Sequence, residues 1–224
     1  MLTIKNVQIY GLERALIASG NPMTVGEINT LPVDEDLGPQ TQALERGERL
    51  GKAEAGSGHD NFLKGIIVQF DVKYPQYWTP EYQRYKFESI VSSQSKMHRL
   101  MKVAASEEFD SLFNSFVDKE AIDRIRGYVK NYNEQVEIDQ INHLLIKDGG
   151  GDRQYYWFMK ALSNLPMGYE MWMTCSSNYL SLKTIVNQRW NHKLGEWRLF
   201  CKTMIDELPL FKELIGFEEH IQLR

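Results

Sequence analysis

The chain has 224 residues, a length that suits one large domain or two small ones. Hydrophobic residues make up 42% and charged residues 25%, as in an ordinary globular protein. The net charge of −4 and the pI near 5.8 argue against bulk nucleic-acid binding, which usually shows as a basic surface. A small anionic ligand remains compatible with this charge, because it needs only a few local Arg or Lys residues.

The two cysteines, Cys175 and Cys201, form neither a CxxC pair nor a Cys/His cluster. This spacing argues against a structural zinc site and predicts free buried thiols in a reducing compartment. The first residues lack the basic segment and apolar run of a signal peptide, and no apolar stretch approaches the ~18 residues that a membrane span needs. We therefore expect a cytoplasmic protein that binds no metal, no nucleic acid and no membrane.

The first quarter of the chain combines one strand with short or charged helices. Residues 2–10 alternate enough to predict a strand, and residues 12–19 can follow as a short helix. Residues 24–40 are polar and contain two prolines, which favours a loop or a weak helix. Residues 41–55 indicate a charged helix with little apolar face, which we expect to be exposed or to pack on a partner subunit.

The strongest strand prediction covers residues 64–74, where apolar side chains alternate with polar ones. The alternating apolar residues are Ile66, Val68, Phe70 and Val72. Pro75 ends this strand, and Pro80 suits the first turn of a helix that runs to about Phe87. Residues 88–95 are polar and partly β-branched, which is compatible with a strand or a loop.

The remainder is mostly helical, which predicts an α+β protein with a helix-rich C-terminal half. Residues 106–130 indicate one or two helices with a break near Asp118, and the glycines at 149–151 indicate a further break. No internal repeat or domain boundary is visible, so we expect a single domain over residues 1–224. The other elements expected here are helices over 133–146, 152–165, 178–190, 192–205 and 208–215, and a strand over 169–175.

Several common catalytic motifs are missing from the sequence. It contains no GxxxxGK[ST] phosphate-binding loop, no GxGxxG fingerprint between a strand and a helix, and no GxSxG nucleophile elbow. His192 and Glu196 share a helix face, but a helical zinc protease requires a second histidine at this spacing. A surface contact is the better interpretation of that pair.

One arginine, Arg189, is predicted to lie on the apolar face of a helix. Leu182, Ile185 and Arg189 follow one another at i, i+3 and i+7 and so form one narrow stripe, which Asn178 shares. A buried arginine must find an anion, because an unpaired buried charge is too costly to keep. The guanidinium fits either a carboxylate or a phosphate, so the pattern predicts a buried ion pair or a phosphate-binding pocket.

Other polar residues are weaker candidates for a site. The segment from Ser92 to Arg99 concentrates hydroxyl, amide and cationic groups, which suits contacts with a phosphate or a base edge. A hydrophilic loop explains that composition equally well. His59 follows a Gly-Ser-Gly loop, where a histidine is more often structural than functional. Arg84 and Lys86 can simply complement a helix dipole.

Three separated segments, taken in order, resemble the flavin-dependent thymidylate synthases. The first is the loop Gly58-His59-Asp60, followed by a strand of the form Val-x-Phe-x-Val-Lys-x-Pro over 68–75. The family has a Gly-His-Glu loop before such a strand. The second is Leu165-Pro166, with Asn178 twelve residues after the proline. The third comprises Asn178, Ser181-Leu182, Asn187-x-Arg189 and then Trp197 eight residues on, similar to an Asn-x-x-Ser-Leu…Arg helix of the family.

The chain departs from the family in its hallmark, Arg-His-Arg-x-x-Ser-x-Asn-Glu-x-Ser-x-Arg-Tyr. Arg84 and Ser89 match, Tyr85 replaces the titratable histidine, and Lys86 keeps a charge without the bidentate fork. An ungapped alignment puts Ser92 at the glutamate position and Lys96 at the final arginine, whereas a one-residue slip puts Ser93 and Met97 there. Leu180 stands where the family usually has a cation.

The resemblance implies a thymidylate synthase-complementing-protein-like fold with a central mixed sheet and long helices. It also implies reductive methylation of dUMP to dTMP with FAD, methylenetetrahydrofolate and NADPH, in a homotetramer with sites between subunits. By this resemblance the FAD-binding residues are His59, Arg84, Lys86, Asn178 and Ser181, and the dUMP-binding residues are Ser92, Ser93, Gln94, Ser95, Lys96 and Arg189. No protein nucleophile is implied. The alternatives are a catalytically degenerate relative that keeps the fold, and a flavin oxidoreductase acting on another substrate.

Overall fold

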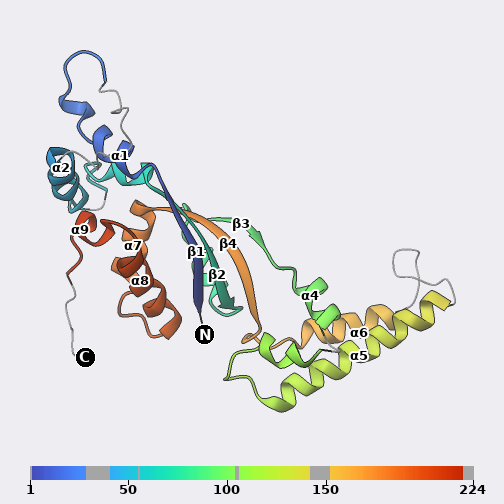
Figure 1. Ribbon diagram of the computed structural model, residues 1–224. Helices are drawn as coiled ribbons and strands as arrows, with labels where there is room; N and C mark the ends of the chain where they lie inside the picture. Colours follow the sequence, from blue (N-terminus) through green and yellow to red (C-terminus); the bar gives the residue numbers. More distant parts are fainter. Residues whose placement is uncertain (1, 29–40, 55, 104–105, 142–151, 219–224) are drawn as a thin grey trace. The chain divides into compact units, whose positions relative to one another are not determined.

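The computed structural model describes residues 2–28, 41–54, 56–103, 106–141 and 152–218, and the glycine break expected at 149–151 lies outside them (Figure 1). Four strands form one antiparallel sheet in the order β1-β2-β4-β3. The α+β class and the helix-rich C-terminal half are confirmed, with the sheet antiparallel rather than mixed. The strands are β1 (Thr3–Tyr10), β2 (Ile67–Pro75), β3 (Ser89–Ser93) and β4 (Glu170–Asn178).

The chain divides into two compact units. Unit 1 contains Lys73–Tyr82 and Ser92–Met173, and unit 2 contains Leu2–Val72, Gln83–Val91 and Thr174–Arg224. The strands β2, β3 and β4 have residues in both units. A single domain over the whole chain therefore stays a prediction.

The period-2 pattern of the strongest predicted strand appears in β2 as alternating burial. Val68, Phe70 and Val72 are fully buried or nearly so, and the Phe70 ring packs edge-on against Phe200 of α8 (Gly195–Glu207) at 5.8 Å. The strand begins at Ile67, later than predicted, because Asn61–Gly65 form the short 3-10 helix η2. The sheet in unit 2 therefore has one apolar face covered by a helix.

Helix α2 (Thr41–Gly51) is not the fully exposed helix that was one of the two expectations, because Ala43, Gly47 and Gly51 are buried. Packing on a partner subunit stays a prediction. It packs within unit 2 through small residues, and the prediction missed this because it relied on the many charged residues of the helix. A Cβ added at Gly47 would lie 2.4 Å from Leu16, and one at Gly51 would lie 2.2 Å from the carbonyl oxygen of Leu214. The two glycines thus allow α2 to approach its neighbours closely. The other helices of unit 2 are α1 (Leu12–Ala18), η1 (Asn21–Met23), α7 (Tyr179–Arg189) and α9 (Phe211–Ile215).

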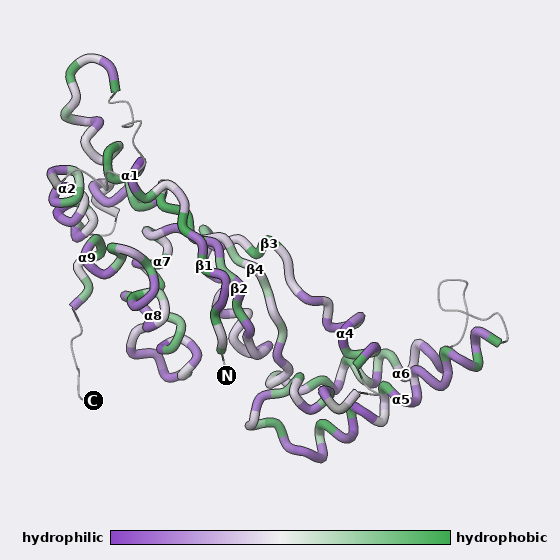
Figure 2. The backbone as a smooth tube through the Cα atoms, viewed as in Figure 1, coloured by the Kyte–Doolittle hydropathy of each residue, from purple (hydrophilic) through white to green (hydrophobic). Residues whose placement is uncertain are grey.

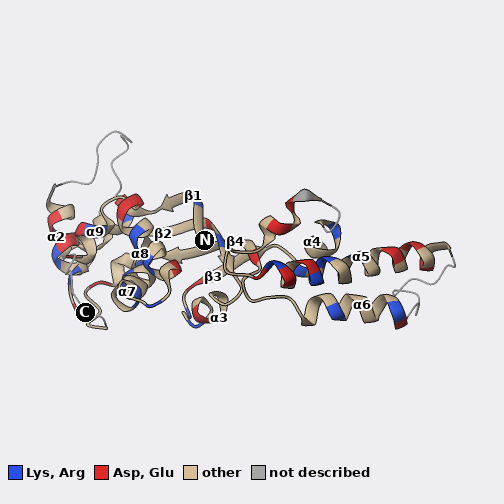
Figure 3. Cartoon of the chain, turned by 90° about the horizontal axis from the view of Figure 1, so that it is seen from below, with Lys and Arg blue, Asp and Glu red and all other residues tan. Residues whose placement is uncertain are grey.

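Unit 1 contains a pair of packed helices, α5 (Lys119–Ile141) and α6 (Asp152–Ser163). The break near Asp118 is confirmed, but α5 continues through the region where a second helix was expected to begin. Charged residues of both signs lie along α5 (Figure 3), and hydrophilic and hydrophobic residues are interleaved along it (Figure 2). Stacked rings of Tyr128 and Trp157 join the two helices. The smaller helices are α3 (Thr79–Tyr82), α4 (Lys96–Val103) and η3 (Glu107–Leu112).

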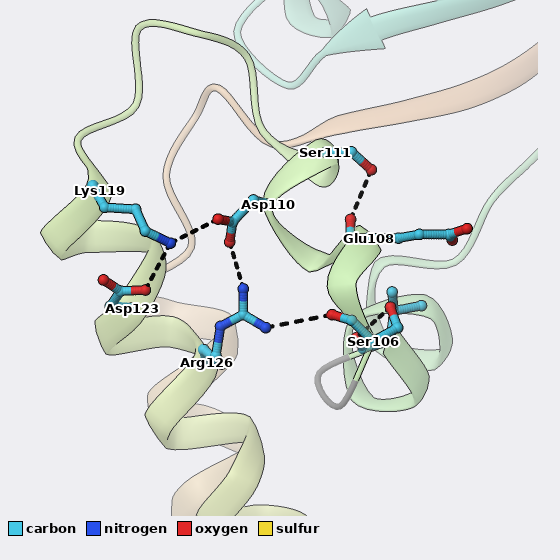
Figure 4. Close-up of polar contacts among 8 residues, drawn as sticks. Ser106, Glu108, Asp110, Ser111, Lys119, Asp123 and Arg126 are labelled. Atoms are coloured by element: carbon cyan, nitrogen blue, oxygen red, sulfur yellow. Dashed lines mark hydrogen bonds and ion pairs between the residues drawn. The ribbon is translucent and has the colours of Figure 1, made fainter.

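A cluster of charged residues connects η3 to the first turns of α5 through ion pairs and hydrogen bonds (Figure 4). The carboxylate of Asp110 accepts hydrogen bonds from Lys119 at 2.6 Å and from Arg126. Arg126 also lies over the Phe109 ring, and Lys119 forms a second ion pair with Asp123. The hydrogen bond from Lys119 lowers the pKa of Asp110.

Among the helices of the described residues, none combines the length and apolar character needed to cross a membrane.

Candidate functional site

Helix α7 brings a cation into an aromatic environment in unit 2. Asn178 caps the helix, and its side-chain oxygen accepts a hydrogen bond from the backbone N–H of Ser181 at 3.0 Å. Leu182 and Ile185 are fully buried, as the predicted stripe requires. Arg189 ends the helix and is half-buried. The apolar side of α7 therefore fixes where the guanidinium points.

The guanidinium of Arg189 is surrounded by Tyr85, His192 and Trp197. Its Nε donates to the hydroxyl of Tyr85 at 2.8 Å, and its Nη1 lies 2.8 Å from His192 Nε2. It also lies 5.0 Å from the centre of the Trp197 ring, which is fully buried. Because a guanidinium can only donate, this contact is a hydrogen bond in the tautomer of His192 that leaves Nε2 unprotonated. The ring faces of tyrosine and tryptophan stabilise the positive charge.

Tyr85 explains one departure from the family hallmark. Its hydroxyl accepts from Arg189 and donates to Gln188 Oε1 at 3.1 Å, and its ring packs edge-on against Trp197. The residue that replaces the titratable histidine therefore binds the end of α7. Arg84 and Lys86, on either side of it, are exposed.

Cys201 lies in the same buried region, where Arg189 influences it electrostatically. Burial raises the pKa of the Cys201 thiol to about 12, and the nearby positive charge of Arg189 opposes part of that rise. A thiol with this pKa is protonated at neutral pH and is a poor nucleophile. Cys201 is therefore a packing residue, as the prediction of a free buried thiol requires.

Helix α7 contains a buried ion pair that involves Lys183, a residue outside the predicted stripe. Lys183 Nζ donates to Asp60 Oδ2 at 2.8 Å, and both side chains are almost completely buried. Sequence reasoning missed both residues. A signal was present, because apolar residues occur on more than one side of α7 and a helix of that kind is buried all round. Lys183 therefore had to be buried with an anion, although nothing local identified Asp60.

The five expected FAD-binding residues all lie in unit 2. Asn178 and Ser181 lie together at the start of α7, where Asn178 caps the helix and Ser181 is buried. His59 is exposed in the loop before η2, and its backbone N–H lies 3.4 Å from Ser57 Oγ. The structure thus gives Asn178 a structural role and leaves the side chains of His59, Arg84 and Lys86 exposed to solvent.

The expected dUMP-binding residues are divided between the units: Ser92–Lys96 belong to unit 1 and Arg189 to unit 2. Ser92 and Ser93 are exposed at the end of β3. Gln94 pairs with Trp172 of β4 twice, through its backbone N–H at 2.9 Å and its side-chain oxygen at 3.0 Å. Ser95 accepts a hydrogen bond from the backbone N–H of His98 near the start of α4, at 3.3 Å. Gln94 and Ser95 therefore also stabilise the local fold.

Lys96 contacts a residue that the sequence did not indicate. Its ammonium donates to Gln76 Oε1 at 3.1 Å, and the buried Nε2 of Gln76 has no hydrogen-bond partner among the residues that the structure describes. Arg99, one turn further along α4, donates to the carbonyl oxygen of Glu170 at 2.7 Å and lies over the Tyr169 ring. Burial raises the pKa of Tyr169, and Arg99 opposes this rise. Unit 1 thus places two cations and an orphaned amide donor near the segment from Ser92 to Lys96.

The fold is that of the flavin-dependent thymidylate synthases, as comparison with solved structures shows. ThyX from Helicobacter pylori, solved in complex with FAD and dUMP, superposes with a TM-score of 0.60 at 19% identity over 96% of both chains. The UMP/dUMP methylase PolB from Streptomyces cacaoi, bound to 5-Br dUMP, gives 0.56 at 16% identity over 96% of this chain and 95% of PolB. No protein-family model and no curated protein matches the sequence.

Proposed function

We propose that this protein is a flavin-dependent methyltransferase that converts dUMP to dTMP. The observation that carries the proposal is Arg189, held at the end of α7 by Tyr85 and Trp197 in a fold shared with ThyX. A guanidinium on a rigid helix suits a phosphate dianion, because it offers parallel N–H donors and remains charged. Arg189 then binds the phosphate of dUMP.

The FAD-binding residues in this proposal are His59, Arg84, Lys86, Asn178 and Ser181. The exposed cations of Arg84 and Lys86 suit the pyrophosphate of a dinucleotide, and the amide of Asn178 suits the polar edge of a flat ring. These donors therefore fit FAD. When bound, FAD carries the hydride, methylenetetrahydrofolate donates the carbon, and NADPH reduces the flavin. The protein itself binds and orients these molecules and excludes water.

The second group of dUMP-binding residues is Ser92, Ser93, Gln94, Ser95 and Lys96. Their hydroxyl and amide groups suit the edge of a pyrimidine, and Lys96 adds a positive charge. The orphaned Nε2 of Gln76 beside Lys96 supports a polar ligand here. Because this group belongs to unit 1, it is tested by its own variant, Lys96→Ala.

Homotetramer formation is part of the proposal, as is a cytoplasmic location. The free buried thiols of Cys175 and Cys201 support a reducing compartment. Every residue of β3 is exposed, including Ile90 and Val91, and β3 is an edge strand of the sheet. An exposed edge with apolar side chains favours contact with another chain. Light scattering of the purified protein tests the assembly, and a monomeric mass contradicts it.

A catalytically degenerate relative is the second candidate, and one observation favours it. The residues that replace the hallmark contribute to the fold itself, since Gln94 pairs with Trp172 and Tyr85 binds Arg189. Rescue of a thymidine-requiring bacterial strain separates the two candidates. Growth without thymidine supports the enzyme, whereas no growth with well-expressed protein supports the degenerate relative.

The visible absorption spectrum is the direct test of the proposed function. FAD and then dUMP are added to the purified protein, and a flavin band that shifts with dUMP indicates that both ligands bind. Arg189→Ala should abolish the dUMP response and leave the FAD spectrum intact. Flavin binding without a dUMP response indicates instead an oxidoreductase that acts on another substrate. No FAD binding at all contradicts the proposed function.

A further inference from the structure

The buried pair of Lys183 and Asp60 joins α7 to the segment from Gly51 to Asp60, more than 120 residues earlier in the chain. Besides Asp60, the Lys183 ammonium donates to the carbonyl oxygens of Gly51 at 2.7 Å and Ala53 at 2.9 Å. An ammonium has three protons, so these three acceptors satisfy it. A buried cation is stable only with such complete pairing, which makes the geometry around Lys183 strict.

Two of the acceptors lie at the C-terminal end of α2, and Gly51 is its last residue. The last carbonyl groups of a helix lack intrahelical donors and carry the negative end of the helix dipole. The ammonium of Lys183 donates hydrogen bonds to these carbonyl groups, and its positive charge balances the negative end of the helix dipole. The close approach of Gly51 to Leu214, which a Cβ would prevent, holds this helix end in place. One side of the Lys183 contact is therefore rigid.

The third acceptor, Asp60, ends the loop that contains His59. This loop includes Gly56 at φ 87° and Gly58 at φ 81°, conformations that favour glycine and give the loop little stiffness of its own. Two of its internal hydrogen bonds are long, 3.4 Å from His59 N to Ser57 Oγ and 3.3 Å from Asn61 N to the Gly58 carbonyl, and one from Ser57 N to the Glu54 carbonyl measures 3.1 Å. Asp60 is 1% exposed, whereas His59 is exposed. Fixing Asp60 inward therefore fixes the direction in which His59 points outward.

Lys183 lies on the same helix as Asn178 and Ser181. The start of this helix is also fixed to the chain after η2, because the backbone N–H of Tyr179 donates to the Ile66 carbonyl at 3.1 Å. The ion pair thus connects the His59 loop to the helix that carries two other proposed FAD-binding residues. We propose that Lys183 is a positioning residue, which acts through Asp60 to hold His59 in place for FAD; this inference rests on the proposed function.

The test uses the double variant Lys183→Met with Asp60→Leu. A single substitution would leave one buried charge unpaired and could unfold the protein, whereas removing both charges with apolar side chains is often neutral for stability. We expect hydrogen exchange at residues 57–61 to accelerate more than in the rest of unit 2. The melting temperature should fall by only a few degrees, because the Gly51 and Ala53 carbonyls lose the Lys183 donor while no buried charge is left unpaired. FAD affinity should fall on the order of tenfold. This is the change expected when one hydrogen bond to a charged group, or two hydrogen bonds between neutral groups, are lost.

A mutant cycle with His59→Ala distinguishes positioning from a general loss of stability. His59→Ala should weaken FAD binding in the wild type and have little further effect in the double variant, because the loop is already released. Arg46→Met is the matched control, since Arg46 also binds main-chain carbonyls, those of Leu16 and Ile17 in α1, and among the described residues donates no hydrogen bond to Asp60 or His59. It should leave the FAD affinity unchanged.

Two results overturn the positioning role itself: unchanged exchange at residues 57–61, or an equal cost of His59→Ala in both backgrounds. A wild-type protein that binds no FAD overturns the proposed function instead, and with it the FAD part of this inference. Faster exchange at residues 57–61 would then still assign Lys183 as the residue that holds the loop.

Discussion

The Nε atom of Arg189 donates a hydrogen bond of 2.8 Å to the hydroxyl of Tyr85, a residue 104 positions earlier in the chain. The same tyrosine stands where the flavin-dependent thymidylate synthases have a titratable histidine. A phenol hydroxyl can accept from the guanidinium and donate to Gln188 at the same time, as it does here. The contact therefore links the most altered part of the family hallmark to the residue proposed to bind phosphate.

Tyr85→Phe should weaken dUMP binding about tenfold, because a hydrogen bond to a charged group contributes ~1.5–3 kcal/mol and the phenyl ring keeps only the packing. FAD binding should change little. Titration calorimetry with each ligand measures both effects. Tyr156→Phe, on an exposed tyrosine of unit 1, is the control. Equal dUMP affinities for Tyr85→Phe and the wild type would show that Tyr85 does not orient Arg189.

Arg189→Ala should remove the preference for dUMP over deoxyuridine, which differ only in the phosphate. The wild type should bind dUMP at least tenfold more tightly, and the variant should bind the nucleotide and the nucleoside with similar affinity. Competition titrations with both ligands measure this ratio. A ratio that survives the substitution would place the phosphate elsewhere on the protein. Arg189→Lys should give an intermediate ratio, because the lysine keeps the charge without the fork.

Cys201 should resist alkylation at pH 7 to 9 in the folded protein, since burial raises its pKa to about 12 and the reactive thiolate is scarce. The positive charge of Arg189 lowers this pKa, so Arg189→Ala should make Cys201 still less reactive rather than more. Mass spectrometry after iodoacetamide treatment counts the labelled cysteines. Rapid labelling of Cys201 in the native protein, before any unfolding, is the contrary outcome.

Thr174→Val should destabilise the protein by about 1 kcal/mol at neutral pH, a typical value for one hydrogen bond, and much less in acid. Thr174 donates to the Asp71 carboxylate, and this bond, followed by one from Asn6, lowers the pKa of Asp71. A lowered folded pKa gives stability that is present above the unfolded value of about 3.9 and lost as the pH falls through the folded value.

Thermal unfolding from pH 2 to pH 7 measures the difference between Thr174→Val and the wild type. The difference should shrink as the pH falls below about 4, because the protonated carboxyl no longer depends on the Thr174 donor. Thr184→Val is a control, since Thr184 donates to a backbone carbonyl and its contribution should not vary with pH. If the stability difference between Thr174→Val and the wild type stayed constant across this pH range, it would not depend on the ionisation of Asp71.

The sequence by itself determined the features that depend on local periodicity. Alternation predicted β2 because neighbouring side chains of a strand point to opposite faces, and Val68, Phe70 and Val72 are buried accordingly. The i, i+3, i+7 spacing placed Arg189 beside the buried residues of α7 for the same kind of reason. The sequence motifs also predicted the fold, because their order and spacing reflect the order of its elements.

Only the tertiary structure decided which distant groups meet. Tyr85 binds Arg189 and Asp60 binds Lys183 across more than a hundred residues, and no periodicity specifies such a pairing. Helix α2 was expected to be exposed because its charges are visible in the sequence, whereas the space that Gly47 and Gly51 leave for Leu16 and Leu214 is a property of three dimensions. Local rules act along a few residues, but burial depends on what the rest of the chain brings into contact.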